Sequence, residues 1–218
     1  MKDNCRLMRT IESAFTTRET SNDGSNPEET EKRIEGYFAV FDGTYEIAPG
    51  LSESVAPEAF DETITGDIRA LTDHDTTLVL GRTAAHTLEL RTDSHGLWGS
   101  VLINPNDQDA MNLYARVQRG DVNQCSFGFD ILDEDTEIRE NGDIHWTIRK
   151  VKLYEVSVCT FPAYETTDVS ARSNEAKEIR KKTVDAWKLR QQEAHGWLKK
   201  GESEANGKAE DIAAPEED

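Results

Sequence analysis

The chain has 218 residues, 36% of them hydrophobic, and a formal net charge of -18. Residues 1–170 hold 15 Lys and Arg against 32 Asp and Glu, so nearly all of this negative charge lies there. A domain this acidic repels phosphate, which argues against nucleic-acid binding. Because no apolar run is long enough for a membrane span and the N-terminus lacks the apolar segment of a secretory signal, we expect a cytoplasmic protein without membrane contact.

The first part of the chain changes from polar to apolar. Residues 1–33 are expected to form a flexible arm with at most one short edge strand, because residues 16–33 are polar and rich in turn formers. Residues 34–41 are rich in aromatic and β-branched side chains and predict a strand. A short helix is expected over residues 56–64. His74 follows at a polar corner between two further predicted strands.

The middle of the chain predicts a hairpin and then a helix. Residues 87–103 alternate in polarity on either side of a turn, as paired strands do. A helix is expected over residues 108–119, capped by Asn106 or Asp107 and ended by Gly120. Its apolar face consists of Ala110, Leu113, Tyr114 and Val117.

The strand predicted over residues 122–132 carries Ser126. Cys125 and Phe127 point to one face, which we expect to pack the core. Ser126 and Gly128 point to the other face, which we expect to have open space in front of it. A serine in a strand is most often an ordinary packing residue, so Ser126 by itself indicates little about chemistry.

The last predicted strand, residues 152–161, follows a second hairpin and is apolar on both faces, as a central strand is. Glu155 is its polar exception. A buried carboxylate needs a partner, which is either Arg or Lys in an ion pair or another functional group. A helix is expected over residues 175–200, with Trp187 and Trp197 on a stripe that docks on the core or on a partner. An acidic disordered tail follows.

The sequence gives no support for a metal or a cofactor. Its three cysteines are odd in number and form no CxxC pair, and its five histidines lack metal-ligand spacing. There is no Walker loop, no GxGxxG and no GxSxG motif. We therefore expect no cofactor, no metal site and no disulfide framework.

Nucleophilic catalysis is the class of chemistry that remains. A serine nucleophile needs a neutral imidazole as base and a third group that orients the imidazole. Ser126 is the candidate nucleophile, His74 the candidate base and Glu155 the candidate orienting group. His86 is a second candidate for the base, and Cys125 is a rival nucleophile that its alternation places in the core.

Several segments, in this order, resemble the prohead proteases of tailed phages, the serine proteases of capsid maturation. The segments are GYFAVF at 36–41, PEAF at 57–60, LTDHD at 71–75, DSHGL at 93–97, RGDV at 119–122, SFGF at 126–129 and LYEVS at 153–157. The resemblance implies that His74 and Ser126 are catalytic and that Glu155 is the third member. It also implies an α+β fold similar to herpesvirus assemblin, a mostly antiparallel β-barrel core with peripheral helices, here followed by a C-terminal helix.

The resemblance implies a role as well. A protease of this family cuts the scaffolding segment of the major capsid protein, and itself, inside the procapsid in the host cytoplasm. We expect an N-terminal arm over residues 1–33, a protease domain over 34–170, and a C-terminal helix and tail over 171–218. Both arms are candidate self-cleavage regions, and the protease is a candidate homo-oligomer. The alternative is a non-catalytic acidic scaffold or chaperone that binds capsid subunits.

Overall fold

The computed structural model describes residues 7–12, 15–21, 30–41, 43–161, 172–186 and 188–190. The chain divides into two compact units, Met1–Ser170 and Ala171–Asp218. The described part of the second unit is a helix over residues 172–186 and 188–190, which begins three residues before the range of 175–200 where a helix was expected. Trp187 and Trp197 lie outside the described residues. Within the described segments, no helix is long and apolar enough to cross a membrane.

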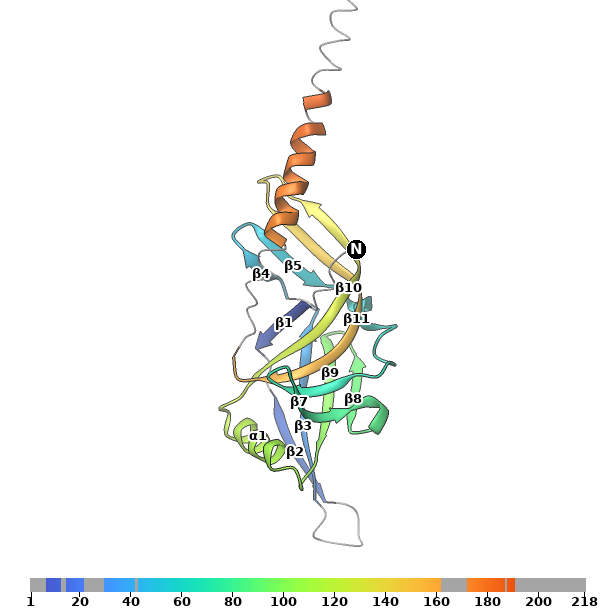
Figure 1. The fold of residues 1–218 in the computed structure, drawn as a ribbon, viewed down its shortest axis with the longest axis vertical. Coiled ribbons are helices and arrows are strands. Elements are labelled where there is room, and N and C mark those ends of the chain that lie inside the picture. Colours follow the sequence, from blue (N-terminus) through green and yellow to red (C-terminus); the bar gives the residue numbers. More distant parts are fainter. Residues whose placement is uncertain are drawn as a thin grey trace, which may run out of the picture. The chain divides into compact units, whose positions relative to one another are not determined.

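The first unit is built on two sheets, and both appear in Figure 1. The larger sheet has seven strands: β1 (Leu7–Glu12), β10 (Gln124–Ile138), β11 (Ile144–Cys159), β5 (Leu51–Val55), β4 (Tyr45–Ala48), β6 (Arg69–Thr72) and β7 (Asp75–Arg82). The smaller sheet has four strands: β2 (Thr16–Ser21), β3 (Thr30–Val40), β9 (Gly96–Ile103) and β8 (Leu88–Thr92). The helical segments are η1 (Pro57–Phe60), η2 (Thr83–Ala85) and α1 (Gln108–Arg119).

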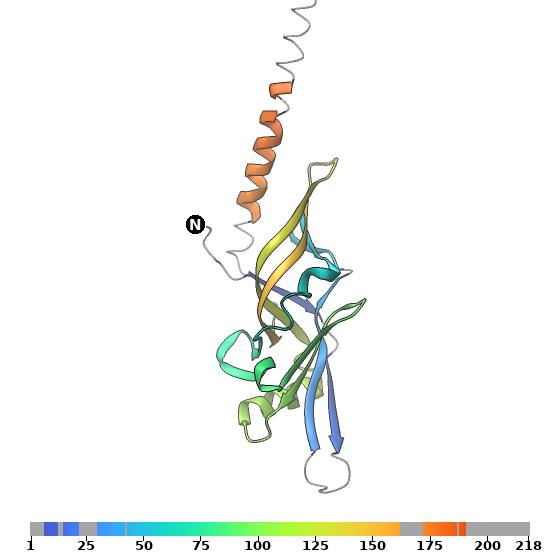
Figure 2. The same ribbon diagram turned by 90° about the vertical axis from the view of Figure 1, so that its right-hand side faces the viewer.

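Strand β11 organises the larger sheet. One edge of β11 pairs with β10 along most of its length, and Figure 2 shows these two strands as a long twisted pair. The other edge pairs in parallel with β5 over residues 144–148 and with β6 over residues 155–158. The sheet therefore branches at β11. Strands β5 and β6 lead outward to the edge strands β4 and β7.

The predicted barrel is wrong in one respect, because the two sheets are open. Closure of a barrel requires the first and last strands of a sheet to pair with each other. Here the edge of β11 that faces away from β10 pairs with two different short strands, β5 and β6. Strands β4 and β7 have no further strand partner among the described residues. The class is α+β as expected, and the described part is mostly strands with few helices.

The described part of the N-terminal region contains more strand than its composition suggested. Strand β1 pairs with the start of β10, and β2 and β3 form a hairpin that pairs Thr16 with Glu35. The polar residues of this hairpin were expected to form a flexible arm. Cross-strand pairing satisfies the backbone of a polar strand even where few side chains are buried, which is why composition alone missed it. The division of the chain into residues 1–33, 34–170 and 171–218 stays a prediction.

Helix α1 confirms its prediction in detail. Asp107 caps it by accepting from the backbone N–H groups of Asp109 and Ala110, and Gly120 ends it in the left-handed conformation with φ 86°. The predicted apolar face is the buried face. A core of aromatic and aliphatic side chains joins both sheets and this helix, and includes Phe38, Phe60, Leu113, Phe127 and Val156.

Candidate active site

His74 occupies a two-residue turn that joins β6 to β7. Thr72 pairs with Asp75 across the turn, so Asp73 and His74 are its two central residues. Their φ angles are 47° and 61°, the left-handed values that a type I′ hairpin turn requires at both positions. Non-glycine residues adopt this conformation at an energetic cost, so other contacts must hold the turn in place.

Those contacts come from the end of β11. The backbone N–H of Asp73 donates to the carbonyl of Val158 at 3.0 Å. The Asp73 carboxylate accepts from the backbone N–H of Thr160 at 2.7 Å and from the Thr160 hydroxyl at 3.2 Å. The backbone N–H of His74 donates to Ser157 Oγ at 3.3 Å. The turn is thereby fixed to the strand that carries Glu155.

His74 and Glu155 form a direct buried contact. Nδ1 of His74 lies 2.7 Å from Oε1 of Glu155, and the side chains are 12% and 4% exposed. The second carboxylate oxygen of Glu155 accepts from the Ser157 hydroxyl at 2.5 Å. Among the described residues, the polar side chains bonded to Glu155 are therefore a histidine and a serine and not Arg or Lys. The ion-pair interpretation of Glu155 is thus not supported.

Ser126 lies on the same face of the β10–β11 pair. It is directly opposite Ser157, and Gly128 is opposite Glu155. Paired residues of antiparallel strands project to one side, so the serine and the carboxylate share that side. Ser126 is 0% exposed, and its hydroxyl makes no hydrogen bond with the part of the chain that the structure describes. The open space expected in front of Ser126 is therefore wrong, because Ser126 is enclosed.

The structure thus brings two of the three predicted residues into hydrogen-bond contact and places the third on their side of the sheet. Sequence reasoning missed two further polar residues, Ser157 and Cys159. Cys159 Sγ lies 3.9 Å from Nε2 of His74. Both residues follow Glu155 at intervals of two, and this alternation was a signal that could have identified them.

The rival candidates lie elsewhere. Cys125 is buried on the opposite face of β10, and its thiol donates to the carbonyl of Tyr37 at 2.9 Å. His86 is exposed at the end of η2. His145 bridges the hydroxyls of Ser52 and Ser54 at 2.8 and 2.9 Å. Across the described ranges, no three His, Cys, Asp or Glu side chains are grouped so that they could hold a metal ion.

Electrostatics distinguish Cys159 from a reactive cysteine. Burial, followed by the negative charges of Asp73 and Glu155, raises the pKa of the Cys159 thiol to about 12. A thiolate is the nucleophilic form of cysteine, and this environment disfavours it. Cys159 is therefore a neutral thiol beside the imidazole at physiological pH.

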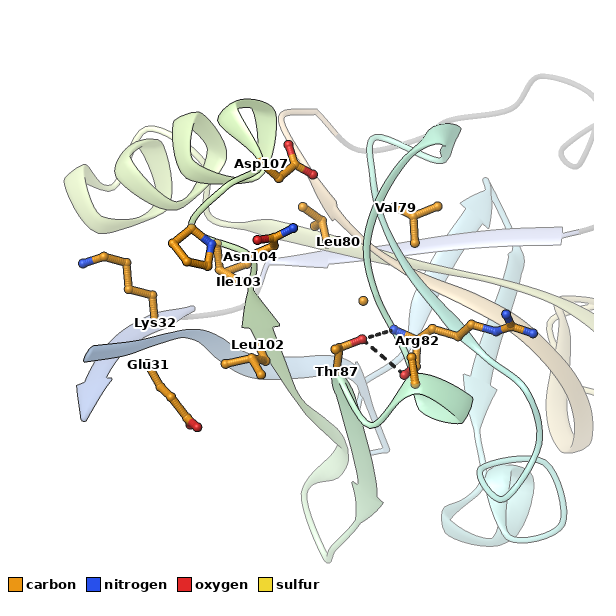
Figure 3. A pocket seen from close by; sticks show the side chains of 13 residues that line it. Glu31, Lys32, Val79, Leu80, Arg82, Thr87, Leu102, Ile103, Asn104 and Asp107 are labelled. Carbon is orange, nitrogen blue, oxygen red and sulfur yellow. Dashed lines mark hydrogen bonds between the residues drawn. The ribbon is translucent and has the colours of Figure 1, made fainter. Parts of the chain in front are cut away.

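A separate cavity of about 780 Å³ lies along β7, and its lining is shown in Figure 3. Val79 and Leu80 of β7, Leu102 and Ile103 of β9, and Pro105 contribute apolar surface to it. The backbone of Arg82 and the hydroxyl of Thr87 are hydrogen-bonded at its wall. His74, Ser126 and Glu155 do not line this cavity.

The geometry around His74 suits proton transfer. A carboxylate bonded to Nδ1 favours the tautomer in which Nδ1 carries the proton and Nε2 has a free lone pair. Such an imidazole can accept a proton from a hydroxyl or thiol close to Nε2. Ser126, Ser157 and Cys159 all lie on this side of the sheet, and of these three only Ser126 lacks a side-chain hydrogen-bond partner among the described residues.

A protein-family profile matches most of this chain, and known proteins are similar to it. The sequence profile described as caudovirus prohead serine protease matches residues 17–182. The prohead protease of Enterobacteria phage HK97 is 30% identical over 142 residues, which cover 63% of this chain and 59% of that protein. The bacteriophage T4 capsid assembly protease has a similar structure over 71% of this chain and 99% of its own, with a TM-score of 0.42 and 9% identity. The chain thus spans about three fifths of the length of the HK97 relative. Because the family profile matches more than half of its residues, the chain belongs to the caudovirus prohead serine protease family.

Proposed function

We propose that the protein is a serine endopeptidase of phage capsid maturation. Ser126 is the nucleophile, His74 the general base and Glu155 the residue that orients His74. The observation that carries this proposal is the buried 2.7 Å contact between Nδ1 of His74 and Glu155, on the same side of the sheet as Ser126. Family membership supports the same reaction class.

The proposed mechanism assigns one task to each side chain. Nε2 of His74 takes the hydroxyl proton of Ser126 while Oγ attacks the carbonyl carbon of the scissile peptide bond. Glu155 stabilises the imidazolium that forms, and Ser157 holds the second oxygen of Glu155 in place. The imidazolium then gives its proton to the leaving amine, and water hydrolyses the acyl-enzyme by the reverse sequence.

The Ser126 hydroxyl must meet His74 for this reaction to begin. The structure has no hydrogen bond between the two, and catalytic hydrogen bonds often shorten only when substrate binds. For the reaction to begin, the side chains of Ser126 and His74 must turn toward each other, while β11 holds the backbone of both residues in place.

The substrate and the setting are part of the proposal. The expected substrates are the scaffolding segment of the major capsid protein and the protease itself, inside the procapsid of an infected cell. We also propose that the fold is similar to that of herpesvirus assemblin and that the protease domain covers residues 34–170. Accumulation of many copies within one shell would favour a weak homo-oligomer by mass action.

The deciding experiment is co-expression of the protease with the major capsid protein of its phage. We expect the wild-type chain to cut the capsid protein and Ser126→Ala to lower the rate by more than about a thousandfold. Cys159→Ala serves as the matched control, because it removes the thiol that lies beside His74 on this side of the sheet and should retain processing.

The outcomes separate three alternatives. Normal processing by Ser126→Ala would refute the serine mechanism. Processing lost in Cys159→Ala but retained in Ser126→Ala would assign the reaction to the thiol. Normal capsid assembly without any cleavage in the wild type would favour the non-catalytic scaffold. A fluorophosphonate that labels serine nucleophiles, followed by peptide mapping, should modify Ser126 in the purified wild-type chain.

A further inference from the structure

The second nitrogen of the His74 ring faces a thiol. Nε2 lies 3.9 Å from Cys159 Sγ, whereas Nδ1 is bonded to Glu155. Ser126, opposite Ser157 in the strand pair, is fully buried and its hydroxyl has no hydrogen-bond partner among the described residues. The nitrogen that would take the serine proton is therefore in contact with a different residue.

The chemistry of Cys159 suits it to be a weak partner of the imidazole. It is 1% exposed, and it lies on the same face of β11 as Glu155 and Ser157. As a neutral thiol it has one S–H proton, and a thiol is a poor hydrogen-bond donor. Two acceptors are within reach of that proton: Nε2 of His74 at 3.9 Å and the carbonyl of Ser157 at 3.8 Å.

A weak donor at this position has a clear physical effect. The bond from Nδ1–H to Glu155 leaves the lone pair of Nε2 free to accept, and the nearby S–H can occupy it without transferring a proton. A hydroxyl donor would hold the lone pair more strongly and would compete better with Ser126. The imidazole is thus held in place but can leave the thiol at little cost.

We propose that Cys159 is a positioning residue of this site: its thiol holds Nε2 of His74 in the resting protein, and the ring leaves the thiol when it engages Ser126. This inference rests on the proposed serine mechanism. It makes Cys159 a competitor of the nucleophile for the same nitrogen, so removal of the thiol accelerates the first chemical step.

The test uses the full-length protein and the fluorophosphonate probe. The rate of Ser126 phosphonylation is measured for the wild type, Cys159→Ala and Cys159→Ser. We expect Cys159→Ala to react roughly two- to threefold faster, the lower end of the factor that corresponds to the loss of one hydrogen bond, because a thiol is a poor donor. Cys159→Ser restores a donor and should react no faster than the wild type.

Cys125→Ala is the matched control, because it deletes a buried thiol from the other face of the same strand pair. It should leave the phosphonylation rate unchanged. Infrared spectra supply a second readout: the S–H stretching band that Cys159→Ala removes should shift when Ser126 is phosphonylated. A thiol with a purely structural role would show no such shift.

The results distinguish the two proposals. If the probe modifies Ser126 but Cys159→Ala reacts at the wild-type rate or more slowly, the positioning role is refuted and the serine mechanism stands. If the probe modifies no residue, or one other than Ser126, the proposed function itself fails. A reaction in which Cys159→Ala and Cys159→Ser are both accelerated would also refute the positioning role, because volume and not the donor would then matter.

Discussion

Ser126 and Ser157 lie opposite each other in the β10–β11 pair, and replacing each by Ala should change the stability of the fold very differently. Ser126 and Ser157 are both 0% exposed and share one face of the sheet. Ser157 donates to the Glu155 carboxylate at 2.5 Å and accepts from the backbone of His74 at 3.3 Å, whereas the Ser126 hydroxyl has no partner within the described segments. Replacement of each by Ala removes one oxygen from the same buried environment.

The expected free energies of unfolding follow from these contacts. A hydrogen bond to a charged group contributes about 1.5–3 kcal/mol, and the longer neutral bond from the His74 backbone adds about 0.5–1 kcal/mol. Ser157→Ala should therefore lower the free energy of unfolding by about 2–4 kcal/mol. Ser126→Ala removes a buried hydroxyl that has no partner among the described residues, so we expect it to be neutral or to stabilise the fold by up to about 1 kcal/mol.

Urea unfolding monitored by tryptophan fluorescence would measure the difference, with equal m-values as the condition for comparing midpoints. Ser126→Ala should have its midpoint at or above that of the wild type, and Ser157→Ala clearly below it. If Ser126→Ala lost as much stability as Ser157→Ala, the Ser126 hydroxyl would have a partner in the folded protein. The loss of stability in Ser157→Ala would then no longer support the proposed role of Ser157 in holding Glu155.

Two more predictions concern single side chains. Burial, and then the charge of Arg139, lowers the pKa of His145, so the unfolded chain takes up a proton there at a higher pH than the folded chain. The wild type should therefore lose stability relative to His145→Gln as the pH falls below about 6.5, the ordinary histidine value, and equal slopes in pH-dependent urea unfolding would contradict this. At the hairpin turn, Asp73→Asn should lower the free energy of unfolding by less than about 1 kcal/mol, and Asp73→Ala should lower it by about 2–3 kcal/mol, both measured by urea unfolding. The difference is expected because Asn tolerates a positive φ and its side-chain oxygen still accepts from the backbone N–H of Thr160. Equal losses for the two variants would show that neither property matters.

Local patterns in the sequence predicted the elements that depend on local interactions. Helix α1 was predicted with its correct ends, because its cap at Asp107, its four-residue apolar face and its stop at Gly120 are all encoded within one short segment. The hairpin of β8 and β9 was predicted for the same reason. Alternation also placed Cys125 in the core, where it is found.

Features that depend on distant pairing were not predictable in this way. The division of one edge of β11 between β5 and β6 joins segments about 90 residues apart, and this division leaves the sheet open. The polar residues 16–21 and 30–33, which form β2 and the start of β3, have no apolar pattern that would reveal their pairing. At the site, the three candidates came from residue chemistry and family resemblance, whereas the contact of Cys159 with His74 depends on a turn docked by tertiary contacts.

The hairpin of β6 and β7 has a consequence for how the protein would lose activity. His74 lies in the turn after β6, which has only four residues, whereas Ser126 and Glu155 lie on strands of 15 and 16 residues. Local opening of a short edge hairpin requires less free energy than global unfolding. Heating should therefore displace His74, the proposed base, before Ser126, the proposed nucleophile, so that inactivation becomes reversible and precedes the melting of the sheet.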